Sequence, residues 1–166
     1  GGIVNARVRE PASDLFRGEA DFNLYDAGVA VEGPLSSTWS GGAAFRRSWV
    51  DTLLPLVLPD DAPLSFTQAP RFYDYQFLAS GKPSEADRVR FLFFGSQDKL
   101  VAILERPAGD PSISGDLRSR IAFHALQGAW SRTFSPSLKM ESSLSLGLQE
   151  FDTALGQSLF FNLKTK

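Results

Sequence analysis

The stretch PSLKMESSLSLGLQEF, residues 136–151, decides the fold. From position 138 to position 148 every second residue is apolar except Ser142, and the residues between them are polar or glycine. The apolar residues are Leu138, Met140, Leu144, Leu146 and Leu148. A period of two is the repeat of a β-strand with one oily face, whereas a helix with ~3.6 residues per turn would scatter these leucines around its surface. The stretch therefore predicts a long strand.

The same alternation recurs along the chain and predicts an all-β protein with about eight strands. We expect strands at residues 16–25, 27–33, 39–48, 72–79, 88–95, 117–134, 136–151 and 155–166. The connections at residues 49–71 and 97–116 are long, and the others are shorter. If consecutive strands are antiparallel, both long connections lie at one end of the sheet, which is the layout of outer-membrane barrels.

Composition excludes several classes of protein. The chain has 166 residues and a formal net charge of -2, which fits one domain and argues against a broad nucleic-acid surface. The absence of cysteine excludes disulfides and thiolate metal sites. No apolar run approaches the ~18–20 residues of a transmembrane helix. A membrane role would therefore use a β-barrel or the membrane surface.

Alternation alone does not say which face meets water. A soluble barrel turns its apolar face inward, and a membrane barrel turns the same face toward lipid. The membrane barrel is favoured by the strongly charged polar face of residues 17–23, which suits a watery lumen. It is also favoured by the length of residues 117–134 and 138–151, because a strand that crosses a membrane needs ~9–11 residues. Aromatic residues near strand ends are expected to form interfacial girdles; they are Phe16, Tyr25, Trp39, Trp130, Phe134 and Phe151.

The opening residues GGIVNARVREP, 1–11, resemble the end of the plug domain of TonB-dependent outer-membrane receptors. Phe16-Arg17-Gly18 resembles the start of that family's first barrel strand, and Val31-Glu32-Gly33-Pro34-Leu35 resembles its Gly-Pro-Leu periplasmic turn. The next strand carries Phe45 and Arg46. The match covers about the first 50 residues; its order and spacing carry the resemblance more than any single motif.

The resemblance implies an antiparallel up-and-down transmembrane β-barrel in the outer membrane. Residues 1–11 would end a plug-like segment and residues 12–166 would form a partial barrel of about eight strands, so we expect a fragment of a longer chain. The family imports scarce nutrients with energy delivered through TonB, which grips a box upstream of the plug. The implied partners are outer-membrane lipid, a small nutrient ligand and TonB, the last through an N-terminal plug region missing from these 166 residues. No nucleic acid and no cofactor are expected.

The resemblance also assigns the two faces of residues 39–48. Trp39, Ala43 and Phe45 are expected to face lipid. Ser40, Ala44 and Arg46 are expected to face the lumen, with Arg46 and Arg47 near the outer rim.

Residues 49–71 are the best candidate for a functional loop. Leu53, Leu54 and the apolar residues that follow are too oily for a free loop, so they are expected to fold over the barrel mouth or against neighbouring loops. With residues 71–75 they would shape a ligand surface, and simple loop packing is the alternative. The expected ligand-binding residues are Arg46, Arg47, Asp51, Arg71, Tyr73 and Asp74. The three arginines would bind an anionic ligand or a lipopolysaccharide phosphate, or would pair with Asp51, Asp60 or Asp74.

Catalysis is not expected, because the sequence offers no organised acid, base, nucleophile or metal cluster. His124 is the single histidine. We expect it to be a polar residue of the lumen or rim beside Arg118 and Arg120, rather than part of a triad with Ser48 and Asp51. The pair at 60–61 is expected to lie in a solvated turn rather than a calcium site.

Two other functions remain open at this point. The chain would be a complete small outer-membrane barrel with a structural or adhesive role if residues 1–166 close and insert alone. It would be a soluble all-β binding domain if it stays monomeric in water without detergent.

Overall fold

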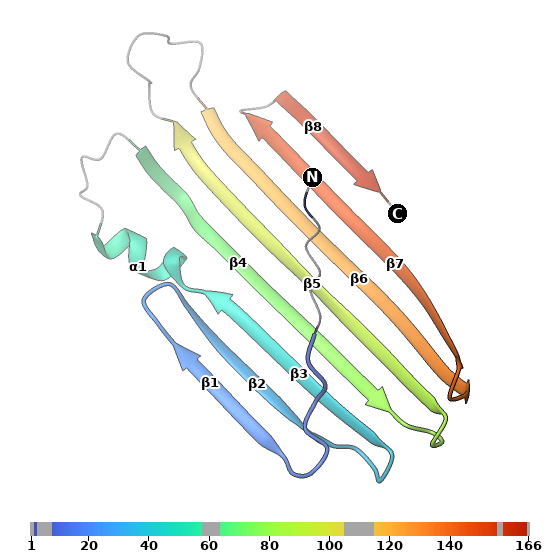
Figure 1. Ribbon diagram of the computed structural model, residues 1–166. Helices are drawn as coiled ribbons and strands as arrows, with labels where there is room; N and C mark the ends of the chain where they lie inside the picture. The colour runs from blue at the N-terminus through green and yellow to red at the C-terminus, as the bar shows by residue number, and fades with distance from the viewer. Residues whose placement is uncertain (1, 3–7, 58–63, 105–114, 156–157, 166) are drawn as a thin grey trace.

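The computed structural model describes residues 2, 8–57, 64–104, 115–155 and 158–165. They form one sheet of eight antiparallel strands that follow one another in chain order, with one short helix at an end of the sheet (Figure 1). The elements are β1 (Arg17–Phe22), β2 (Asp26–Pro34), β3 (Trp39–Ser48), α1 (Val50–Val57), β4 (Leu64–Gly81), β5 (Asp87–Leu104), β6 (Gly115–Ser135), β7 (Leu138–Leu155) and β8 (Ser158–Thr165). The all-β, up-and-down prediction is confirmed. The sheet is open, with β1 and β8 at its edges, so closure into a barrel stays a prediction.

The connections expected at residues 49–71 and 97–116 are shorter than predicted. β4 already begins at Leu64 and β5 runs to Leu104, and these two residues pair across the strands. The pairing shifts register between Ser65 and Gln68 and again between Gln68 and Arg71. Such bulges break the alternation of apolar and polar residues, which is the signal that reveals a strand in the sequence.

Helix α1 occupies the first part of the predicted 49–71 loop. The carbonyl of Trp49 accepts hydrogen bonds from the backbone N–H groups of Thr52 and Leu53, at 2.8 and 3.1 Å, and so starts the helix. The helix continues two residues beyond Pro55. Proline removes one backbone donor, which the helix tolerates here. Within the described residues, no helix has the length and apolar character needed to cross a membrane.

The two ends of the sheet differ. The end that we name the turn end carries tight connections at residues 35–38, 82–86 and 136–137 (Figure 1). The opposite end, named the loop end, carries the β1–β2 turn, α1 and the connections whose residues lie outside the described part of the chain. The long connections therefore lie together, as the alternation of the strands predicted.

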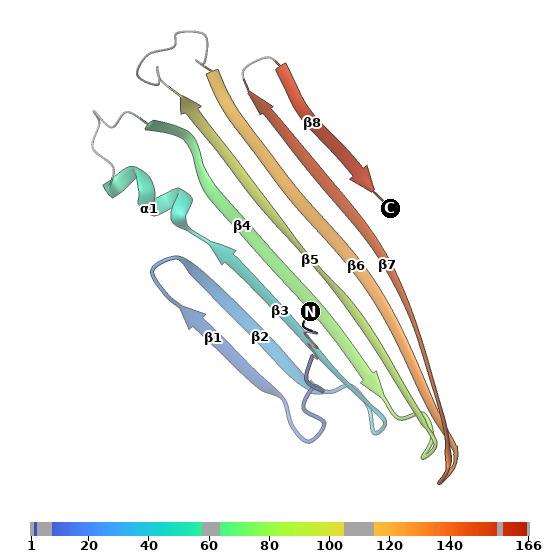
Figure 2. The ribbon, with the colours of Figure 1, turned by 45° about the horizontal axis from the view of Figure 1, so that its top comes forward.

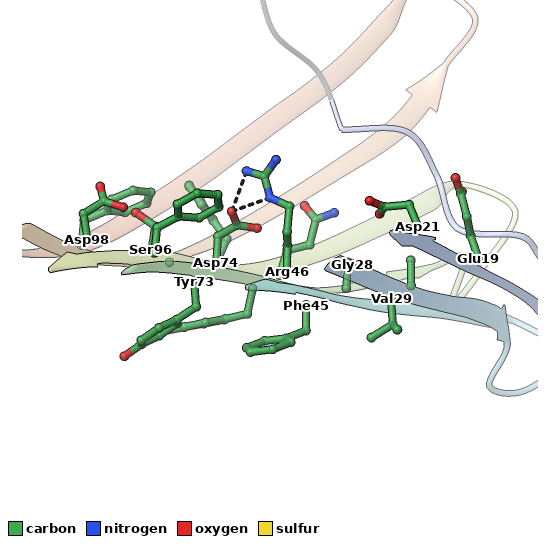
Figure 3. A pocket seen from close by; sticks show the side chains of 18 residues that line it. Glu19, Asp21, Gly28, Val29, Phe45, Arg46, Tyr73, Asp74, Ser96 and Asp98 are labelled. Carbon is green, nitrogen blue, oxygen red and sulfur yellow. Dashed lines mark hydrogen bonds and ion pairs between the residues drawn. The ribbon is translucent and has the colours of Figure 1, made fainter. Parts of the chain in front are cut away.

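The register defines two faces. Val29, Phe45 and Tyr75 are neighbours in one row across β2, β3 and β4, and the row continues through Gly95, His124 and Leu148. We name the side of this row the apolar face and the other side the polar face. Figure 3 shows Val29, Phe45 and Tyr73 on one side of the sheet, with Arg46, Asp74 and Asp98 on the other. The predicted division of residues 39–48 between two faces is confirmed, and which face meets lipid stays a prediction.

A single sheet leaves little interior. The buried apolar residues of the described part are Ala12, Leu92 and Ala122. By contrast, Phe77 is 51% exposed, Phe22 is 75% exposed and Leu144 is 66% exposed. A sheet normally buries its apolar face against a second layer of structure. The apolar face therefore requires another apolar environment.

Candidate functional site

The polar face carries a groove of about 770 Å³ over strands β1 to β6 (Figure 3). The charged side chains of its lining are Glu19, Asp21, Arg46, Asp74 and Asp98, and Ser96 adds a hydroxyl group on the same face. These residues share a face because they stand at alternate positions of registered antiparallel strands. The groove is therefore lined by more carboxylates than cations.

Arg46 and Asp74 form the central ion pair of this groove. They are directly opposite each other on β3 and β4. Arg46 Nε and Nη2 both donate to Asp74 Oδ2, at 3.0 and 2.7 Å. The guanidinium also lies over the Phe72 ring, 5.5 Å from its centre. Both charged side chains remain partly exposed, so the pair fixes orientation more than it stabilises the fold.

Asp21 lies over Gly28 on the neighbouring strand. A Cβ atom at position 28 would stand 2.4 Å from Asp21 Oδ1, which is closer than atoms can approach. Glycine at this position therefore makes room for the carboxylate at the edge of the groove (Figure 3).

The segment before β1 crosses the polar face, where the views of Figures 1 and 2 place it in front of the sheet. Arg9 Nη1 lies 2.8 Å from Glu32 Oε1 of β2, and this hydrogen bond raises the pKa of Arg9. On β5, Arg90 donates to the Val8 carbonyl and lies 3.7 Å from a carboxylate oxygen of Glu10. A second groove of about 470 Å³ lies between this segment and strands β1–β4.

In Figure 3 the faintly coloured C-terminal strands rise on the side of the sheet that carries Arg46 and Asp74. The N-terminal segment passes over the same side. The sheet thus curls toward its polar face, and the hollow side holds both the groove and the N-terminal segment. Residues 8–11 belong to the stretch predicted to end a plug; that division of the chain stays a prediction.

The six residues predicted to bind a ligand do not form one site. Arg46 and Asp74 meet in the groove. Arg47 is on the apolar face and pairs with Asp51 of α1 at 3.1 Å. Tyr73 points away from the groove in Figure 3, and Arg71 shares its face by register. Adjacent residues of a strand point to opposite faces, so the sequence cluster is split by the sheet.

Sequence reasoning missed three residues that the structure brings to the polar face. Glu32 and Arg90 hold the N-terminal segment, and Asp98 lines the groove. The alternation that puts each of these residues on one face of its strand is visible in the sequence. The register that decides which residues of other strands lie next to them is not, because it depends on the turns and bulges that join the strands.

His124 shares the apolar face with Arg118 and Arg120, as the alternation predicted. Its Nδ1 atom is 2.6 Å from Tyr75 Oη. It lies on the opposite side of the sheet from the groove, and its expected place in the lumen or at the rim stays a prediction. Within the described residues, no group of three or more His, Cys, Asp and Glu side chains could hold a metal ion. The pair at 60–61 lies outside the described residues.

The apolar face carries a belt without charged side chains. At the turn end the belt is bounded by Asp87 and Arg132, which lie 3.4 Å apart and are registered partners. At the loop end it is bounded by Arg120 and Glu150. Between these limits the described positions of the apolar face contain no Asp, Glu, Lys or Arg. We name this region the charge-free belt.

The belt has the height of a membrane-spanning band. On β6 it runs from Ala122 to Trp130, which is about 27 Å along the strand at ~3.4 Å per residue. A strand tilted by ~35–45° would cover about 19–22 Å of bilayer, near the ~25 Å apolar band of outer-membrane barrels. Trp39 and Trp130 lie in one row at its turn end, and Trp130 Nε1 donates to Asp87 Oδ1 at 3.0 Å. The indole ring of Trp130 thus lies on an apolar surface while its N–H group has a polar partner, which is typical of tryptophan at a membrane–water interface.

Comparisons of the chain with protein-family models, with curated proteins and with solved structures found no match.

Proposed function

We propose that the chain forms part of an outer-membrane β-barrel of the TonB-dependent-receptor type, which binds or transports a nutrient ligand at the cell surface. The observation that carries the proposal is the charge-free belt on the exposed apolar face, bounded by charged residues at both ends. Large exposed apolar patches on proteins mark contact with a partner or a membrane. A belt of this height is matched by a bilayer.

The polar face would line the lumen. It holds the groove with Arg46 and Asp74, and it carries the N-terminal segment through contacts to Glu32 and Arg90. A segment that crosses the hollow side of the sheet is consistent with the end of a plug inside a barrel. Outer-membrane lipid and TonB are the proposed partners, and the proposal assigns no catalytic role.

Accessibility of single cysteines tests the proposal, because these 166 residues contain no native cysteine. Leu146 and Ser145 are exposed neighbours on β7 that point to opposite faces. The full protein, expressed in a Gram-negative host, would carry L146C or S145C and a nitroxide spin label. Collision with oxygen, which concentrates in lipid, would be compared with collision with a water-soluble nickel chelate.

A membrane barrel predicts high oxygen and low nickel accessibility at position 146, with the reverse order at position 145. Phe93→Cys and Phe94→Cys repeat the comparison on β5, where the two residues also lie on opposite faces. Equal nickel access at all four positions would contradict the proposal. Protection of position 146 in a water-soluble monomer would instead support a soluble all-β binding domain.

Cross-linking of the sheet edges separates a partial barrel from a complete small one. β1 and β8 are the edges of the open sheet. We expect no disulfide between A20C and N162C, which lie on the same face of the sheet, whereas A20C and V29C are registered neighbours and provide the positive control. A rapid cross-link between β1 and β8 would show that these strands close the barrel by themselves, as the small structural or adhesive barrel requires.

A further inference from the structure

Positive charge collects on the apolar face at the loop end, next to the charge-free belt. The register places six cations there on β3 to β8, and we name them the basic strip. They are Arg47, Arg71, Lys99, Arg118, Arg120 and Lys164. The same strands contribute the acidic residues Asp116, Glu150 and Asp152 to this region of the face. The six cations therefore outnumber these three acidic residues, although the whole chain has a net charge of -2.

Three of these cations stand side by side. Arg71 of β4 is the registered partner of Lys99 of β5, and Lys99 is the registered partner of Arg120 of β6. Neighbouring strands are ~4.8 Å apart, so the three backbone positions span about 10 Å. Like charges directly opposite each other destabilise a sheet. Repulsion within this row of three cations therefore destabilises the folded sheet unless an anion lies among them.

The anions of the protein supply only part of the compensation. Glu150 lies 2.5 Å from Lys164 and 3.8 Å from Arg120, and Asp51 lies 3.1 Å from Arg47. Asp152 accepts a hydrogen bond from Asn162.

Arg71 and Lys99 differ from these cations. Within the described residues, neither of them forms an ion pair or a side-chain hydrogen bond. Two neighbouring cations therefore remain available at the centre of the strip.

The turn end of the same face has no comparable excess. Its described boundary is the ion pair of Asp87 and Arg132, which compensate each other. Positive charge thus follows one edge of the belt and not the other. In a membrane, the basic strip would lie next to the headgroups of one leaflet only. Its positive charge favours the leaflet with more anionic lipid.

We propose that the basic strip binds the phosphate groups of a phosphorylated lipid of the lipid A type, seated in the leaflet around the loop end. The inference rests on the proposed function, because it places the charge-free belt in a bilayer. Arginine forms paired hydrogen bonds to phosphate oxygens, and lysine adds a compact charge. Long cationic side chains at the edge of an apolar belt reach the headgroup level while their stems stay in lipid. Acyl chains of the same lipid would cover the belt itself.

Binding of fluorescent diphosphoryl lipid A to the full protein in neutral detergent tests the inference. The comparison ligand is the same lipid after removal of both phosphates. We expect the phosphorylated lipid to bind at least about tenfold more tightly, and the R71Q/K99Q variant to lose about tenfold or more of that affinity. The K82Q/R88Q variant is the matched control, since it removes the same charges at exposed positions of the turn end and should stay within about twofold of wild type.

Several results would overturn the inference. Equal affinity for both lipids would show that the protein does not recognise the phosphates. An unchanged lipid affinity of the R71Q/K99Q variant would show that the strip is not the binding site. If inorganic phosphate competed with an affinity equal to that of lipid A, the strip would be a site for free anions. Circular dichroism of both variants shows whether the sheet is intact, and K99Q alone provides a milder variant if the double one fails to fold.

The cysteine accessibility experiment separates this inference from the proposed function. If Leu146 is exposed to lipid and lipid A phosphates still have no effect, the strip inference alone fails. If Leu146 is exposed to water, the proposed function fails, and the inference about the strip fails with it because no membrane then surrounds the belt.

Discussion

Tyr75 Oη and His124 Nδ1 form a 2.6 Å hydrogen bond across a strand that lies between them. Tyr75 is on β4 and His124 is on β6, and Gly95 of β5 is the registered neighbour of both. A Cβ atom at position 95 would stand 2.8 Å from the tyrosine oxygen and 2.9 Å from the histidine nitrogen. Glycine thus opens the path of the hydrogen bond. The bond satisfies two polar groups inside the charge-free belt, where an apolar environment would offer them no other partner.

Replacing Gly95 with alanine should destabilise the protein. The added methyl group would also stand 2.6 Å from the Phe123 carbonyl oxygen, so both the backbone and the Tyr75–His124 bond would have to move. Overpacking of this kind costs about 1–3 kcal/mol. Thermal and urea unfolding in detergent would measure it.

Gly128→Ala is the matched control for this substitution. Gly128 is on the same face, and a Cβ atom there would lie 3.8 Å from the nearest ring atom of Phe91, an ordinary contact. Equal destabilisation by both alanines would show that the loss comes from adding a methyl group to the belt in general.

Replacing Tyr75 with phenylalanine should leave His124 without its partner. An unsatisfied polar group in an apolar environment costs about 1–3 kcal/mol. The double variant Y75F/H124F removes both polar groups and should cost less than the sum of the two single changes. Additive free energies of unfolding would mean that the hydrogen bond contributes nothing. The ring contacts of Tyr75 with Phe77 and Phe93, at 6.0 and 5.4 Å between centres, are retained by phenylalanine.

The bond between Tyr75 and His124 also marks the limit of what the sequence predicts. Period-two alternation correctly indicated the strands and assigned Phe45 and Arg46 to opposite faces. It also placed His124 on the face of Arg118 and Arg120. The sequence did not show that Gly95 would lie between Tyr75 and His124, because register depends on bulges and turns that leave no periodic signal.

The candidate site shows the same limit. Arg46 and Asp74 were both selected from the sequence, and the structure joins them. The adjacency of Arg47 to Arg46 in the sequence predicts a shared site, but the pleat of a strand directs neighbouring side chains to opposite faces. The sequence predicts a loop at residues 64–70, where β4 already runs, because the register shifts in β4 disrupt the alternation there.

Loss of the Arg90 guanidinium should release the N-terminal segment from the polar face. Arg90 holds that segment through the Val8 carbonyl and the Glu10 carboxylate. In R90A, a spin label at the exposed position of Ser13 should show faster motion, with a narrower spectrum than in the wild-type protein. The mechanism is local, so the sheet itself should retain its circular dichroism.

Arg88→Ala provides the control, because Arg88 shares the polar face of β5 with Arg90 and lies two positions earlier. If the label moves equally fast in R88A, general loss of positive charge would explain the release. If R90A leaves the spectrum unchanged, the contact of Arg9 with Glu32 is sufficient to hold the segment.

An arginine placed within the charge-free belt should act very differently from one placed beside it on the other face. Leu126 is 46% exposed and lies on the apolar face of β6, near the middle of the belt, whereas Gln127 is its exposed neighbour on the polar face. An arginine at the lipid-facing midplane of a barrel costs about 2–4 kcal/mol, and a lumen position tolerates it. L126R should therefore fold poorly into vesicles while Q127R folds as the wild type does. Protease protection and the shift in gel mobility of folded barrels would measure the difference. In a soluble sheet whose apolar side remained exposed to water, L126R would reduce the free energy of unfolding no more than Q127R. Equal folding of the two variants would therefore show that this face does not contact a bilayer.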